Sequence, residues 1–264
     1  MTHAEDEHPL PSEIVMAEDD LNDDELVRYS RQIVLREVGG SGQLRLRRSA
    51  VAVVGAGGLG SAALLYLASA GVGRITVIDD DVVALDNLGR QVIYATEDVG
   101  RSKATAATSR LRELNPEVAV RAVEEHLDPA TATRLLAGHD VVLEGSDNFA
   151  TKLTVNDACV SLAIPAVIGG VLRFEGQVMT ALPGQACYRC LVGEEPPPGL
   201  IPTCTAAGVL GAVAGTVGAL QASEALRLLL GTGESQGGRV LVIEALGPRM
   251  RAVPLAIDPR CPNH

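Results

Sequence analysis

Residues 53–60, VVGAGGLG, decide the fold because they join a short β-branched run to a helical pattern through glycines. Glycine permits a tight turn and lets backbone N–H groups at a helix N-terminus approach a phosphate. The candidate nucleotide-binding glycines are Gly55, Gly57, Gly58 and Gly60. The next apolar run ends in three aspartates, and Asp79 lies 19 residues after Gly60, where an acid that accepts from a ribose hydroxyl is expected. The turn predicts an adenine nucleotide but does not distinguish ATP from a nicotinamide dinucleotide.

Strand and helix patterns alternate outward from this turn. Strands are predicted at 49–55, 74–81, 117–123, 139–145 and 165–170, with helices at 58–71, 101–114, 129–137 and 149–162. Helices of this length between strands predict a doubly wound, mostly parallel α/β sheet of the Rossmann type. The second half is predicted to extend it with paired strands around Glu175–Gly176, a Pro-rich loop at 183–205, a helix at 206–231 and an antiparallel pair at 238–245 and 249–257.

The charge is uneven along the chain. The formal net charge is −11, and ten of the 33 acidic residues lie in residues 1–25, which contain no Lys or Arg. We expect an acidic, disordered tail over 1–22 and a single domain over 23–264, starting with a helix over 23–36. The nucleotide-binding half would span about 45–170. The half at about 171–264 would bind a partner and a metal.

Composition argues against several classes of protein. The chain has no Trp and two Phe, so the exposed rings that stack on single-stranded nucleic acid are scarce, and no nucleic-acid partner is expected. No uncharged apolar run reaches 18 residues, so no membrane partner is expected either. Five Cys behind an acidic, rather than basic, start predict a cytoplasmic protein.

Polar residues after the strand ends suggest which nucleotide binds. The carboxyl ends of strands in an open α/β sheet converge on one crevice. The residues expected there are Asn87, Arg90, Gln91, Lys103, Asp147 and Asn148. Two cations and a spare carboxylate suit a triphosphate with Mg²⁺, whereas a dinucleotide carries less charge and needs no metal.

Two cysteine-containing pairs are candidate metal ligands. Cys187 and Cys190 have a spacing typical of metal or redox chemistry, and both remain open at this point. Structural zinc takes four ligands, usually as two pairs from separate segments. The other pair with suitable spacing is Cys261 and His264 at the end of the chain.

Seven motifs occur in the order found in a known family. They are RYSRQI, GAGGLG, DNLGRQ, GRSK, SDN, CYRC and TCTAAGV, spread over about residues 23–264. In this respect the chain resembles the ubiquitin-activating-enzyme-like superfamily, and most of all its MoeB/ThiF/HesA adenylyltransferases.

The resemblance implies ATP- and Mg²⁺-dependent adenylation of the C-terminal Gly-Gly carboxylate of a ubiquitin-like sulfur carrier. It implies a homodimer in which Arg31 reaches the partner's ATP site. It assigns Asp79 and Asp81 to the ribose loop and Asp147 to Mg²⁺. The phosphate-side residues it implies are Asn87, Arg90, Gln91 and Lys103.

The resemblance also bears on the thiols. The family completes a Cys₄ zinc site near the C-terminus, which implies zinc held by Cys187, Cys190, Cys261 and His264, with the terminal carboxylate as a competing fourth ligand. Cys204 occupies a position where some relatives form a covalent intermediate in sulfur transfer and others carry a spectator thiol. No sulfurtransferase domain follows residue 264, so a separate sulfur donor is expected.

Two other classes of protein compete with this interpretation. A nicotinamide-dependent oxidoreductase would share the glycine turn but leaves Arg31, Arg90, Lys103 and Asp147 unexplained. A non-catalytic scaffold would have lost some of these residues. The carrier and its pathway are not specified, because molybdopterin, thiamine, cysteine, tRNA-thiolation and natural-product pathways use the same scaffold.

Overall fold

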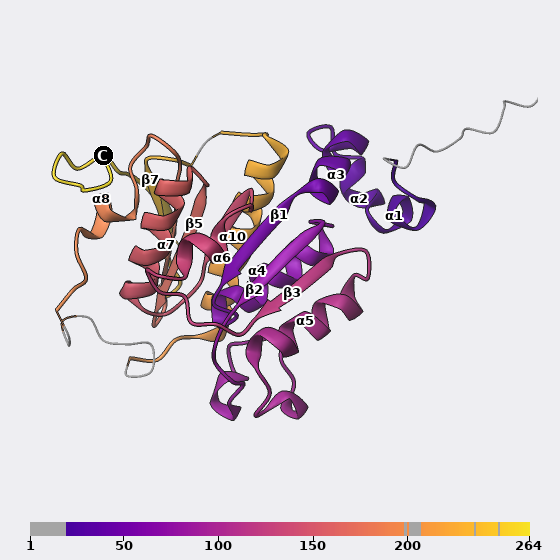
Figure 1. Ribbon diagram of the computed structural model, residues 1–264, viewed down its shortest axis with the longest axis horizontal. Helices are drawn as coiled ribbons and strands as arrows, with labels where there is room; N and C mark the ends of the chain where they lie inside the picture. The colour runs from indigo at the N-terminus through magenta and orange to yellow at the C-terminus, as the bar shows by residue number, and fades with distance from the viewer. Residues whose placement is uncertain (1–19, 198–199, 201–206, 235, 248) are drawn as a thin grey trace, which may run out of the picture.

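The computed structural model describes residues 20–197, 200, 207–234, 236–247 and 249–264. Within these residues, eight strands form one sheet in the order β3-β2-β1-β4-β5-β6-β7-β8 (Figure 1). The strands are β1 (Ala50–Val54), β2 (Arg74–Ile78), β3 (Ala119–Val123), β4 (Val141–Glu144), β5 (Ala166–Leu172), β6 (Glu175–Ala181), β7 (Arg239–Glu244) and β8 (Arg249–Pro254). Strands β1 to β5 pair in parallel, and β6, β7 and β8 add antiparallel pairs. This confirms the predicted parallel sheet with an antiparallel extension.

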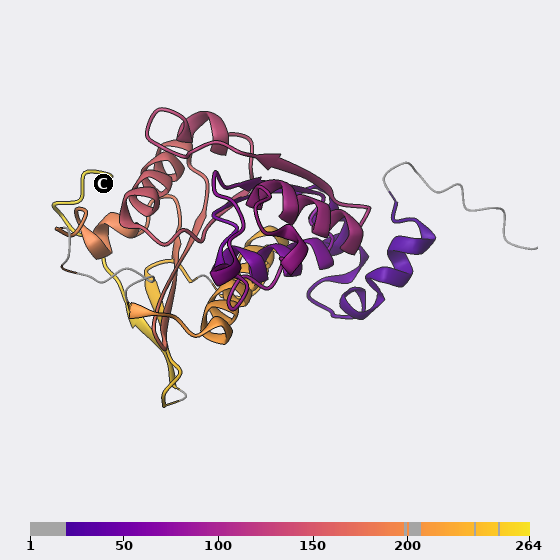
Figure 2. The ribbon, with the colours of Figure 1, turned by 90° about the horizontal axis from the view of Figure 1, so that it is seen from below.

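Helices cover both faces of the sheet, which is why every residue of β1 is buried (Figures 1 and 2). Val51 and Val53 face one apolar core, which includes residues of α4, α5 and α10. Ala52 and Val54 face the other core, with α6 and α7. The helices are α1 (Asp23–Arg28), α2 (Ser30–Ile33), α3 (Gly39–Arg48), α4 (Gly58–Ser69), α5 (Lys103–Leu114), α6 (Ala132–Leu136), α7 (Phe149–Leu162), α8 (Tyr188–Val192) and α10 (Gly211–Leu230), and short 3₁₀ turns lie at Leu85–Asn87 and Thr96–Asp98.

The prediction of one helix over 23–36 is wrong. Helix α1 ends at Arg28 and α2 begins at Ser30, with Tyr29 between them. Tyr29 is buried, and its hydroxyl accepts a hydrogen bond from Asn115 Nδ2 at 2.9 Å. The buried Tyr29 side chain, held by Asn115, explains why the helix is broken between α1 and α2. Helix α3 was not predicted, and the expected tail lies outside the described residues as far as residue 19.

The second half also differs from its predicted boundaries. The turn between the paired strands is at Arg173–Phe174, because β5 runs to Leu172 and β6 begins at Glu175, and Arg173 adopts a positive φ of 55°. Helix α8 interrupts the predicted loop. Helix α10 begins at Gly211, five residues later than predicted.

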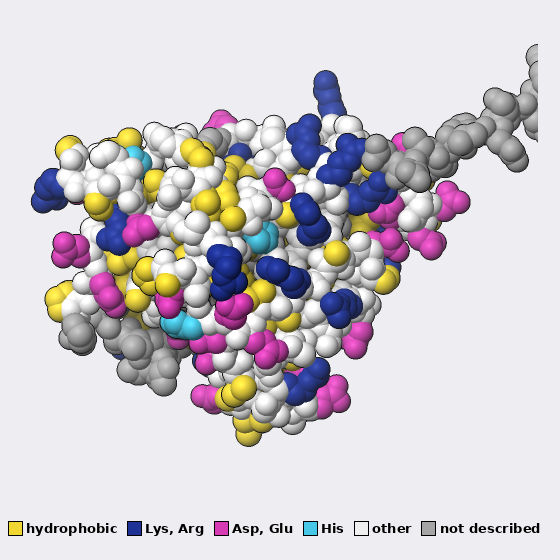
Figure 3. All heavy atoms as spheres, viewed as in Figure 1, with side chains coloured by type: hydrophobic (Ala, Val, Ile, Leu, Met, Phe, Trp, Pro, Cys, Tyr) yellow, Lys and Arg dark blue, Asp and Glu magenta, His cyan; other side chains and the backbone are white. Residues whose placement is uncertain are grey.

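Two features of the described residues concern charge and hydrophobicity. Acidic and basic side chains are interspersed over the face in Figure 3. Among the described residues, none of the helices combines the length and apolar character needed to cross a bilayer.

Close packing at Gly60 gives a stability prediction. A Cβ at Gly60 would lie 1.9 Å from the carbonyl oxygen of Gly55, so the start of α4 would have to move away from β1. We expect Gly60→Ala to lower the free energy of unfolding by about 2 to 3 kcal/mol through overpacking. Gly57→Ala is the control, since its Cβ would meet nothing closer than Gln91 Nε2 at 3.8 Å. Urea denaturation of both variants measures the difference, and equal losses would contradict this account.

Candidate functional site

A cavity of about 720 Å³ opens at the carboxyl ends of the parallel strands. It is lined by loops that follow β1, β2 and β4, and by residues of β5, β6 and β7. Eleven of the predicted nucleotide-site residues line it together: Gly55, Gly57, Gly58, Asp79, Asp81, Asn87, Arg90, Gln91, Lys103, Asp147 and Asn148.

The glycine turn forms one wall of this cavity. Gly55 has φ +84°, and a Cβ there would approach the backbone of Gly145 and Ser146 to 3.0 Å. Gly57 is the N-cap of α4, and no side chain of the described residues caps this end. Its first N–H groups therefore lack helical partners, and such a helix end favours an anion.

Asp79, which follows the end of β2, holds the glycine turn in place. Its Oδ2 accepts from the amide of Ala56 at 2.7 Å, and its Oδ1 accepts from the amide of Asp81 at 3.0 Å. Burial raises the pKa of Asp79, and the charge of Lys103 together with these two amides opposes the shift. The carboxylate thus joins the glycine turn to the loop after β2.

Two cations line the cavity, one paired with a carboxylate and the other with a backbone carbonyl oxygen. Lys103 is 7% exposed, and its Nζ lies 2.8 Å from Asp81 Oδ2. Arg90 Nη1 donates to the carbonyl oxygen of Asp86 at 3.0 Å. Gln91 is buried with its Oε1 unpartnered among the described residues, so a bound ligand would supply the missing hydrogen bond.

The carboxylate of Asp147 is exposed in the loop after β4, and no hydrogen bond to it is present within the described residues. A free carboxylate that lines the same cavity as two cations and a helix N-terminus fits Mg²⁺ bound with a polyphosphate, because Mg²⁺ takes one or two carboxylates and the oxygens of its substrate.

Two predicted site residues do not line the cavity, a third lines it but also caps a helix, and a fourth lies outside the described residues. Gly60 packs on Gly55 and does not line the cavity. Asn148 lines the cavity, but its Oδ1 accepts from the amide of Thr151 and caps α7. Arg31 is exposed on α2 and does not line the cavity. Cys204 lies outside the described residues.

Sequence reasoning missed a buried ion pair in the cavity wall. Glu144 is fully buried at the end of β4, and Lys152 on α7 is 6% exposed. The signal available was a glutamate closing the apolar run VVLE, which a buried strand tolerates only with a cationic partner. Tyr94 was also missed: its hydroxyl donates to the carbonyl oxygen of Ala56 and so supports the glycine turn.

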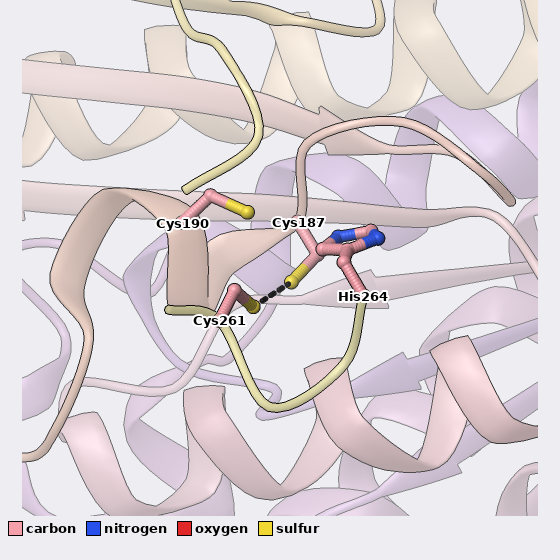
Figure 4. A group of neighbouring side chains, drawn as sticks. All are labelled: Cys187, Cys190, Cys261 and His264. Carbon is pink, nitrogen blue, oxygen red and sulfur yellow. Dashed lines mark hydrogen bonds between the residues drawn. The ribbon is translucent and has the colours of Figure 1, made fainter. Parts of the chain in front are cut away.

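The second site lies beside α8. Ligand atoms of Cys187, Cys190, Cys261 and His264 all lie within 4.8 Å of one another. Figure 4 shows the two pairs facing each other, one beside α8 and one on the C-terminal loop, and Figures 1 and 2 both place the C-terminus beside α8. Cys187 and Cys261 sulfurs are 3.7 Å apart. Tetrahedral zinc with Zn–S bonds of about 2.3 Å separates two sulfurs by about 3.8 Å, so the cluster could hold zinc.

The surroundings prepare this cluster for a metal. Burial raises the pKa of the Cys187 thiol, but hydrogen bonds from Asn156 and the amides of Cys190 and Arg189 lower it to about 7. The Cys187 thiolate is therefore accessible near neutral pH, whereas burial and the hydrogen bond to Cys187 raise the pKa of the Cys261 thiol to about 12. Arg189 also pairs with Asp157 on α7, which in turn accepts from Asn263 of the C-terminal loop at 2.8 Å. These bonds fasten both segments to the same helix.

The fold and the two sites define an α/β protein with a nucleotide-type cavity and a separate Cys₃His cluster. Residues 29–263 match the ThiF family, and the chain belongs to that family.

Two relatives and one solved structure illustrate the similarity. The chain is 49% identical over 238 residues to a SAMP-activating enzyme E1 of Haloferax volcanii, covering 90% of this chain and 88% of the relative. It is 47% identical over 245 residues to a sulfur carrier protein adenylyltransferase of Thermus thermophilus, covering 90% of each. The crystal structure of E. coli MccB with ATP shares the fold, with a TM-score of 0.77, 22% identity and coverage of 89% of this chain and 73% of that one. None of these supports the oxidoreductase alternative.

Proposed function

We propose that the protein adenylates the C-terminal Gly-Gly carboxylate of a small ubiquitin-like sulfur carrier with ATP, releasing pyrophosphate. The observation that carries the proposal is the gathering of a glycine turn, a half-buried ribose-side acid, two cations and a free carboxylate around one cavity. The names of the two relatives, which refer to a SAMP-activating enzyme and a sulfur carrier protein adenylyltransferase, support the same reaction.

The chemistry makes modest demands on the side chains. A C-terminal carboxylate is already ionised at neutral pH, so it needs no general base to attack the α-phosphorus. As the new C–O–P linkage forms, the bond from the α-phosphorus to the bridging oxygen breaks and pyrophosphate leaves. Catalysis then consists of positioning the two reactants in line and stabilising charge on the phosphates.

Each group has a role in this arrangement. Asp79 accepts from the ribose, the amides at Gly57 and Gly58 donate to phosphate, and Arg90 and Lys103 offset phosphate charge. Asp147, with waters and phosphate oxygens, would hold Mg²⁺. When bound, Mg²⁺ supplies charge neutralisation on the polyphosphate.

Further parts of the proposal extend beyond the single chain. Arg31, exposed on α2 and away from the cavity of its own chain, would complete the ATP site of a second copy in a homodimer. Zinc in the Cys₃His cluster would be structural, because four protein ligands leave no position for water. A separate protein would donate sulfur to the activated carboxyl group.

Isotope exchange between ATP and pyrophosphate tests the proposal. The enzyme should catalyse exchange only in the presence of a carrier ending in Gly-Gly, because reversal of adenylation requires the acyl adenylate. The matched control is the same carrier without its last glycine. Exchange that is independent of the carrier's C-terminus would contradict the proposed substrate, and bound NAD(H) after purification would favour an oxidoreductase.

Cys204 provides a second test that separates adenylation from sulfur transfer. We expect Cys204→Ala to leave carrier-dependent exchange within about twofold of the unmodified enzyme, because no thiol takes part in attack on the α-phosphorus. If Cys204 carries sulfur, thiocarboxylate formation with a sulfur donor falls while exchange persists. Loss of exchange itself would contradict this assignment.

A further inference from the structure

A buried ion pair joins the end of β4 to α7 beside the cavity. Glu144 is fully buried, and Lys152 lines the cavity yet is only 6% exposed. Removing two charges from water is unfavourable by several kcal/mol per ion unless both are fully hydrogen-bonded. The position of this pair in the cavity wall therefore raises the question of what it does there.

The hydrogen bonds of Lys152 decide between two roles. Its Nζ donates to Glu144 Oε2, to the carbonyl oxygen of Ser146 at 2.7 Å and to that of Gly169 at 2.6 Å. A lysine has three N–H donors, so none is left for a phosphate in the cavity. Lys152 is thus bound inward to the protein, unlike Lys103, whose one side-chain partner among the described residues is the exposed carboxylate of Asp81.

Both members of the pair hold the same loop residue. Glu144 Oε1 accepts from the amide of Ser146 at 2.8 Å, while Lys152 binds the carbonyl oxygen of Ser146. The backbone of Ser146 is therefore fixed at its N–H and at its C=O. On the other side of Asp147, Asn148 caps α7 through the amide of Thr151 at 2.8 Å.

The loop fixed in this way also contacts the glycine turn. A Cβ on Gly55 would come within 3.0 Å of the carbonyl carbon of Gly145 and the nitrogen of Ser146. Movement of residues 145–148 would therefore change the distance between Asp147 and the helix end where phosphate is expected to bind.

We propose that Glu144 and Lys152 form a clamp that positions the Asp147 carboxylate for the divalent cation bound with ATP. This inference rests on the proposed function for the identity of the cation and nucleotide. Both are positioning residues: they act through Ser146 and Asp147 and do not touch the reacting atoms. An apolar pair could fill the same volume but would leave the carbonyl oxygens of Ser146 and Gly169 without their buried donor.

Metal binding tests the clamp without measuring turnover. Mn²⁺ takes the same oxygen ligands as Mg²⁺, and its free concentration can be followed by electron paramagnetic resonance in the presence of a non-hydrolysable ATP analogue. We expect Glu144→Gln to raise the dissociation constant of Mn²⁺ about tenfold, as for other groups that orient a metal ligand. The matched control is Glu224→Gln, a second buried glutamate, which pairs with Arg227 outside this cavity and should leave the constant unchanged.

A double-mutant cycle separates positioning from general destabilisation. In an Asp147→Asn background, adding Glu144→Gln should change the Mn²⁺ dissociation constant by less than about twofold, because the residue through which the clamp acts is already altered. Independent, multiplicative effects of the two substitutions would overturn the proposal. If Glu144→Gln does not fold, Lys152→Arg keeps the charge but not the lysine geometry and should weaken Mn²⁺ in the same direction.

The outcome distinguishes the clamp from the proposed function. Unchanged Mn²⁺ binding in a folded clamp variant, alongside normal carrier-dependent exchange in the unmodified enzyme, overturns the clamp alone. Weakened Mn²⁺ binding in an enzyme that exchanges with no carrier supports the clamp and overturns the proposed substrate.

Discussion

Asp147→Ala is expected to lower carrier-dependent ATP–pyrophosphate exchange by about a hundredfold to a thousandfold, the range seen when one preorganised charge-stabilising group is removed. The carboxylate is exposed in the cavity and has no protein hydrogen bond within the described residues, so its removal should leave the fold unchanged. The variant should also require a higher Mg²⁺ concentration to reach its half-maximal exchange rate. Exchange rates measured over a Mg²⁺ titration test both points.

The control for this variant is Glu113→Ala. Glu113 is another exposed acid, but it lies on α5 and does not line the cavity. Its removal should change exchange by less than about twofold. If Asp147→Ala exchanged as fast as Glu113→Ala, the assignment of Asp147 to Mg²⁺ would be wrong.

Cys261→Ala is expected to abolish metal binding at the C-terminal cluster. The chain should purify with one zinc per molecule, and the loss of a buried sulfur 3.7 Å from Cys187 leaves too few ligands for a structural site. Structural zinc supplies an apparent 10 kcal/mol or so in isolated fingers, which bounds the loss of stability from above. Metal analysis by mass spectrometry and thermal denaturation measure the two effects.

Cys159→Ala is the matched control for the metal site. Cys159 is a buried thiol of α7 with a pKa raised to about 12 by burial, and it lies outside the cluster. This variant should keep its zinc and lose only the packing of a small side chain. A chain that purifies without zinc and keeps its full stability would contradict a structural role for the cluster.

The first half of the sheet could be predicted because the hydrophobic periodicity and the glycines at the ends of elements indicate the same strands and helices there. Helix α7 lies at Phe149–Leu162, the predicted range, since an Asn cap precedes it and the β-branched run at Ala166 follows soon after it. The break at Tyr29 could not be predicted, because it depends on Asn115, 86 residues away.

The candidate site could be predicted from positions after strand ends, because parallel strands bring those positions together whatever the intervening helices contain. The apolar run before Glu144 indicated that this glutamate needs a cationic partner, but the partner itself could not be identified, since a lysine eight residues away on a different element has no periodic signature. For the metal cluster, spacing and resemblance suggested the ligand set, and the fold brings the distant pairs together.

The most direct test of the central claim is the intact mass of a Gly-Gly-ending carrier after incubation with this enzyme, ATP and Mg²⁺. Inorganic pyrophosphatase would be added to remove the product and prevent reversal. The proposed function predicts that the carrier gains the mass of an adenylyl group, and that a carrier lacking its last glycine does not. A carrier that remains unmodified while the enzyme holds Mg²⁺ and ATP normally would contradict the claim that this cavity activates a carrier's carboxyl terminus.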